Sequence, residues 1–153
     1  MWHQTLKKFD IAEQQLLHAI DLFCSGERII SAITLAGAAE EILGMLVART
    51  GQTNSLGSEV RDHCELFEAF FGRAGDPKTF RDLENKARNE LKHLSAGNNV
   101  EIDLEQEAVS LIERAINNFK ILRPESNSAF LAFDDYAAAW WRNRTNQFNG
   151  TTD

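Results

Sequence analysis

The chain has 153 residues, a net charge of −7, 43% hydrophobic residues and 25% charged residues. These values predict one folded domain and exclude a disordered chain. They also argue against a generic nucleic-acid binder, because such proteins are usually basic. Only Pro77 and Pro124 interrupt the chain, so long helices are allowed.

The N-terminal third of the sequence predicts two helices. Residues 5–24 place apolar side chains every three or four positions, and residues 27–49 are apolar around most of their circumference. The second helix should therefore be the most buried one, and its small residues, which include Gly37 and Gly44, should allow close approach of another backbone. Glu40 and Glu41 lie at its centre, where two carboxylates would be too costly for a membrane span.

Four further helices are expected, over residues 59–72, 78–95, 103–123 and 125–144, with 51–58 as a loop and 146–153 as a frayed tail. The apolar side of the third helix comprises Val60, Cys64, Phe67, Phe70 and Phe71. No segment alternates like a strand. The sequence predicts an all-α antiparallel bundle of about five helices over residues 1–123. A C-terminal aromatic helix (124–145) should follow, packed on its own core or on a partner.

Two cysteines, Cys24 and Cys64, stand far apart without a CxxC pair. This predicts neither a metal site nor a disulfide, and free thiols suit a reducing compartment. The N-terminal stretch is polar, which predicts no signal peptide. We therefore expect a cytoplasmic protein that needs no cofactor and no membrane.

The segment 78–95 differs from the rest in charge. It carries five basic and three acidic side chains, whereas every other segment is acidic. A basic helix of this kind is most often a solvent face with ion pairs between successive turns. The order of its residues, Arg88-Asn89-Glu90-Leu91-Lys92-His93, favours a more specific interpretation.

This RNELKH segment resembles the signature of the HEPN family, an arginine followed by four to six residues and a histidine, often with Asn, Asp or His after the arginine. The resemblance covers about residues 5–123 and includes the preceding small-residue helix, LAGAAEEILGML. It implies a metal-independent endoribonuclease of a toxin or phage-defence system, with an antitoxin as a further partner. It also implies a homodimer in which two motif helices face each other across a cleft.

The chemistry of the motif fits RNA cleavage by attack of a ribose 2′-hydroxyl on the adjacent phosphate. His93 could carry a proton at neutral pH, and Arg88 could stabilise charge on the phosphate. Asn89, four residues before His93 and so on the same side of a helix, could orient either group. Lys86 and Lys92 are the candidate substrate-binding residues.

Glu40 and Glu41 are candidate supporting residues. At least one of them must point inward from a buried helix, where a carboxylate needs a partner. We expect that one orients Arg88 or His93, with the alternative that both reach solvent through a gap in the bundle. For Arg88 itself, the alternative is a purely structural salt bridge, and for His93 a favourable position at a helix C-terminus.

Three functions therefore remain open at the level of sequence. The first is the dimeric endoribonuclease, and the second is a non-catalytic HEPN module that binds a nucleotide or a protein partner. The third is a helical adaptor in which RNELKH occurs by chance.

Overall fold

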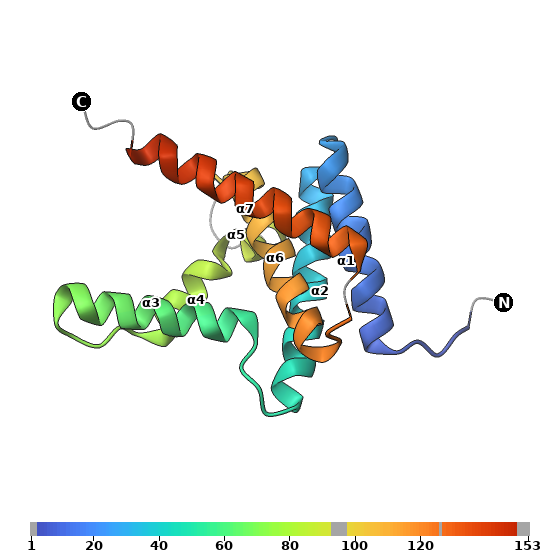
Figure 1. Ribbon diagram of the computed structural model, residues 1–153, viewed down its shortest axis with the longest axis horizontal. Coiled ribbons are helices and arrows are strands. Elements are labelled where there is room, and N and C mark those ends of the chain that lie inside the picture. The colour runs from blue at the N-terminus through green and yellow to red at the C-terminus, as the bar shows by residue number, and fades with distance from the viewer. Residues whose placement is uncertain (1–2, 93–97, 126, 150–153) are drawn as a thin grey trace.

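The computed structural model describes residues 3–92, 98–125 and 127–149, which form seven helices and no strand (Figure 1). Three long helices make a bundle: α1 (Lys8–Ser25), α2 (Ile29–Arg49) and α6 (Leu104–Leu122). Helix α2 is central, since it packs along both α1 and α6. The prediction of an all-α helical bundle is confirmed at this level.

The apolar core lies between these three helices. Its fully buried members include Leu16 of α1, Ile33 and Leu43 of α2, and Leu111 and Ile116 of α6. Helix α2 is long and apolar enough to cross a membrane on length and composition alone. In the structure it packs against α1 and α6, as expected for the most buried helix of a bundle.

Helices α3 (Ser55–Phe71) and α4 (Pro77–Glu84) form an arm that projects from the bundle (Figure 1). The two helices pack mainly on each other. The predicted apolar side of α3 is therefore only partly correct. Val60 is buried, but Phe70 is 80% exposed and Phe71 is also exposed, because both lie near the tip of the arm, beyond the bundle.

The loop predicted over residues 51–58 ends earlier than expected. Helix α3 begins at Ser55, where the side chain of Asn54 accepts a hydrogen bond from the backbone N–H of Gly57. The backbone N–H of Ser55 donates to Oδ1 of the buried Asn118 of α6, at 2.8 Å. A Cβ on Gly44 would lie 3.2 Å from Asn54 and 3.3 Å from Asn118. This glycine thus makes room for side chains, and the prediction that it admits another backbone is wrong.

The single helix predicted over residues 78–95 is two helices in the structure. Helix α4 ends at Glu84, Asn85 forms a turn, and α5 spans Lys86–Lys92. Helix α4 packs on α3, whereas α5 packs on α2, so the chain has to change direction between them. The described part of the motif helix, Lys86–Lys92, lies where the arm meets the bundle (Figure 1), and the predicted residues 93–95 lie outside the described residues.

Helix α7 (Ser128–Asn149) packs on α6 and α1. Its aromatic stripe faces the chain's own core, because Phe130, Phe133 and Ala137 are buried there. This confirms one of the two interpretations of the aromatic helix. The helix continues beyond the predicted end near residue 144 and includes residues 146–149 of the predicted frayed tail, whereas residues 150–153 of that tail lie outside the described residues.

Candidate functional site

Helix α5 carries most of the predicted site residues. Lys86 and Asn89 are exposed, three residues apart and hence on neighbouring turns of one helix face. Arg88 points the other way, toward α2, and its side chain is only 13% exposed. His93, together with the side chain of Lys92, lies outside the described residues. The structure thus places Lys86 and Asn89 on an exposed face of α5 and the partly buried Arg88 on the opposite side.

Arg88 makes ion pairs with both candidate supporting residues of α2. Its Nη1 atom lies 3.3 Å from Oε2 of Glu40 and 3.9 Å from Oε2 of Glu41. Glu40 is the inward carboxylate, with 4% of its side chain exposed, and Glu41 is 56% exposed. The inward position of one glutamate and its contact with Arg88 fit both the expected orienting role and a purely structural salt bridge. Whether this contact serves catalysis stays a prediction.

Gly37 explains how Arg88 reaches this position. A Cβ added at Gly37 would lie 2.8 Å from Cδ and 3.1 Å from Cγ of Arg88. Contacts below 3.0 Å between such atoms essentially never occur, so a side chain here would move the arginine. A glycine stands at this position of the helix because the aliphatic part of the Arg88 side chain lies against it. The prediction that Gly37 admits another backbone is therefore wrong.

This packing predicts that Gly37→Ala destabilises the protein when Arg88 is present and stabilises it when Arg88 is replaced by alanine. In the wild-type background we expect the substitution to lower the free energy of unfolding by about 1–2 kcal/mol, through overpacking against Arg88. In an Arg88→Ala background we expect a gain of roughly 0.5–1 kcal/mol, because alanine is the better helix former. Urea denaturation of the four variants checks this. The same sign in both backgrounds would contradict the contact.

A second buried arginine, Arg114 of α6, holds the arm to the bundle. Its side chain is 1% exposed, and its Nη1 atom lies 3.3 Å from Glu59 of α3 and 3.1 Å from Glu84 of α4. Nδ1 of His63 lies 3.5 Å from the same Glu84 carboxylate. The arm is therefore attached through a cluster of charged groups.

Glu107 of α6 connects this cluster to the motif helix. Burial raises the pKa of its carboxyl, and the nearby Arg114 and the backbone N–H of Arg88 only partly offset this. Burial likewise raises the pKa of Glu59, against the opposing charge of Arg114. The carboxyl groups of Glu107 and Glu59 are therefore partly withdrawn from water, and the neighbouring positive charges do not fully offset the cost of their burial.

These charges limit what the site can do chemically. Two carboxylates offset part of the positive charge of Arg88, and among the described side chains of α5 the exposed Lys86 is a further cation that could contact a phosphate. No group of His, Cys, Asp or Glu among the described residues has a geometry that could hold a metal ion. Among the described residues, the exposed Lys86 and Asn89 could contact a phosphate, whereas the residue expected to transfer a proton, His93, lies outside them.

Sequence reasoning missed Arg114, Glu107 and the acidic residues of the arm. A signal was present, since Glu107, Arg114 and Asn118 recur at intervals of seven and four residues and so share one side of α6. That side lies next to the apolar face, where charged and amide groups need partners from another helix. Which helix supplies those partners depends on the tertiary arrangement.

Comparison of the chain with protein-family models, with curated proteins and with solved structures found no match in any of the three. The functional argument therefore rests on the residues of this chain and their placement in the fold.

Proposed function

We propose that this protein is a HEPN-like, metal-independent endoribonuclease that acts as a homodimer in the cytoplasm, in a toxin or phage-defence system. Its target would be RNA, and an antitoxin protein would be a natural partner. The observation that supports the proposal most is the ion pair that holds Arg88 against Glu40, on the helix that also carries the exposed Asn89. A fixed arginine costs little reorganisation when charge develops on a phosphate.

The proposed reaction assigns one role to each motif residue. His93 would accept a proton from the ribose 2′-hydroxyl or donate one to the leaving 5′-oxygen, and the partner's copy of the motif would supply the complementary step. Arg88 would stabilise the phosphate, and Asn89 would position either group. Lys86 and Lys92 would hold the neighbouring backbone. The products would be a 2′,3′-cyclic phosphate and a 5′-hydroxyl end.

The test is cleavage of RNA in the presence of EDTA. We expect the wild type to cleave and to leave cyclic phosphate ends, and His93→Ala to lower the rate about 100-fold or more. Asn89→Ala should also lower the rate while leaving the midpoint of thermal unfolding unchanged, because Asn89 is exposed. Asn143→Ala, an exposed asparagine on α7, is the matched control and should cleave like the wild type. Intact RNA at all enzyme concentrations, with full viability on overexpression, would refute the proposal.

A specific observation favours a second candidate, a non-catalytic module that binds a protein. The arm exposes large apolar side chains, Leu66, Phe70 and Phe71 on α3 and Leu83 on α4. Exposed apolar residues that gather on one element often mark protein interfaces. If RNA stays intact, co-purification of a partner that is lost on Phe70→Ser would support this candidate.

A further inference from the structure

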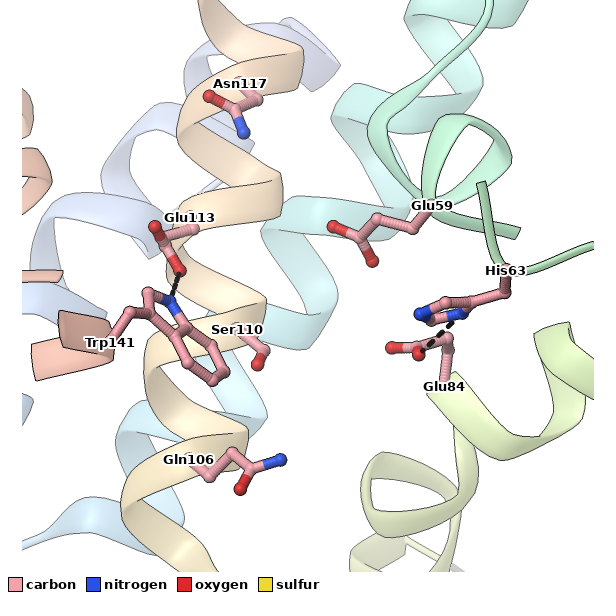
Figure 2. Close-up of a pocket in the computed structure, with 8 residues that line it drawn as sticks. All are labelled: Glu59, His63, Glu84, Gln106, Ser110, Glu113, Asn117 and Trp141. Carbon is pink, nitrogen blue, oxygen red and sulfur yellow. Dashed lines mark hydrogen bonds and ion pairs between the residues drawn. The ribbon is translucent and has the colours of Figure 1, made fainter. Parts of the chain in front are cut away.

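A cavity of about 410 Å³ lies between the arm and the bundle (Figure 2). Glu59 and His63 of α3 and Glu84 of α4 line one wall, while Ser110 and Glu113 of α6 and Trp141 of α7 line the other. This volume is within the usual range for sites that bind small ligands. The residues that line the cavity lie on α3, α4, α6 and α7, and none of them belongs to α5, which carries the proposed RNA site.

The walls of this cavity carry excess negative charge. Glu59, Glu84 and Glu113 contribute three carboxylates, whereas the neighbouring buried cation is the single guanidinium of Arg114, shared between Glu59 and Glu84. His63 adds a positive charge only when it is protonated. An anion such as an RNA phosphate would be repelled here, and a cation would be attracted.

Trp141 gives the cavity an aromatic wall in a fixed orientation. Its indole Nε1–H donates a hydrogen bond to Oε2 of Glu113, at 2.6 Å (Figure 2). An aromatic ring combined with carboxylates is the usual surroundings of ammonium and guanidinium groups, which interact with the ring face as well as with the charge. The described residues include no cluster with metal-ligating geometry, which favours an organic cation over a bare metal ion.

Burial makes the ionised form of two of these side chains, Glu59 and Glu113, less favourable. The pKa of Glu113 is raised by burial, which the hydrogen bond from Trp141 only partly offsets, and the pKa of Glu59 is raised mainly by burial as well. A cation in the cavity would supply the charge compensation that Arg114 alone does not provide.

We propose that this cavity binds an organic cation with an ammonium or guanidinium group, either a free polyamine or the Lys or Arg side chain of a partner protein. The ammonium or guanidinium group lies between Glu59, Glu84 and Glu113, and its hydrocarbon stem packs against Trp141. The inference does not depend on RNA cleavage, since its residues lie on other helices than the motif.

Isothermal titration of the full chain with spermidine, agmatine and the peptide acetyl-Gly-Arg-Gly-amide tests this site. We expect saturable binding of at least one of the three, weakened by added salt. The peptide with citrulline in place of arginine, which is neutral and similar in shape, should not bind. Binding of spermidine or agmatine alone indicates a free cation as the ligand, and preference for the peptide indicates a protein side chain.

Two variants locate the binding. Glu113→Gln keeps an acceptor for the Trp141 indole and removes one charge, so affinity should fall about tenfold. His63→Arg places a permanent positive charge on the opposite, half-exposed wall and should weaken binding further. Glu65→Gln, an exposed glutamate on the same helix as Glu59, is the control and should bind like the wild type. Absence of saturable binding by all three probes, or equal affinity in Glu113→Gln and Glu65→Gln, would overturn the proposal.

Discussion

Arg114→Ala is expected to lower the free energy of unfolding by about 3–5 kcal/mol, one of the two largest effects on stability that we predict for a single substitution. The side chain is 1% exposed and pairs with Glu59 and Glu84 at once. Its removal leaves two carboxylates facing each other beside a void in the bundle, and the arm loses its charged attachment. Urea denaturation followed by circular dichroism measures the loss.

The exposed Arg81 of α4 provides the matched control for this experiment. An arginine on the surface of the arm should change the free energy of unfolding by no more than about 0.5 kcal/mol when replaced by alanine. A similar small loss in Arg114→Ala would show that the cluster does not hold the arm to the bundle. Arg114→Lys should fall between the two, because lysine keeps the charge but cannot offer the planar fork of donors.

The second large effect concerns the pair of Arg88 and Glu40. Arg88→Met should cost about 3–5 kcal/mol, because it removes the cation facing a carboxylate that is 4% exposed. Combining Arg88→Met with Glu40→Leu should recover most of this loss, since a buried ion pair is often replaced by apolar residues at little cost. Thermal and urea unfolding of the two single variants and the double variant measure the coupling.

The double variant also separates the structural role of Arg88 from its proposed catalytic role. It should be folded, yet cleave RNA about 10²–10³-fold more slowly than the wild type if the guanidinium stabilises the phosphate. If the double variant is folded and cleaves RNA at the wild-type rate, the role of Arg88 is structural and not catalytic. This comparison is needed because loss of activity in Arg88→Ala alone could follow from unfolding.

The helices of the bundle were predictable from sequence, because their burial follows the helical period. In α1 and α6 apolar residues return every three or four positions, and α2 is apolar on nearly all sides. The start of α3 was only partly predictable: the N-cap residue Asn54 is a local signal, whereas the anchoring contact of Ser55 with Asn118 is distant in sequence. The break at Asn85 was hidden for the same reason: nothing local shows that α4 packs on α3 and α5 on α2.

The candidate site, like the fold, was only partly predictable from the sequence. Sequence reasoning reached a contact between one α2 glutamate and either Arg88 or His93, because a glutamate inside an apolar helix has to find a partner, but it did not select Arg88 or foresee that both glutamates pair with it. It did not reach Arg114 or the acidic cavity. Their partners come from α3, α4 and α7, and only the folded chain shows that these helices meet on one side of α6.

The arm and the bundle are stabilised by different interactions, so we expect them to unfold separately. The bundle is held by apolar packing, whereas the arm adds one buried apolar residue, Val60, and is fastened through Arg114, Asn118 and the turn at Asn85. Regions with few buried apolar contacts open at lower free energy than the core and do so as local units. We therefore expect helices α3 and α4 to detach as one unit while α1, α2 and α6 stay folded. Such a detachment would open the acidic cavity and, at the same time, free the N-terminal end of the motif helix α5.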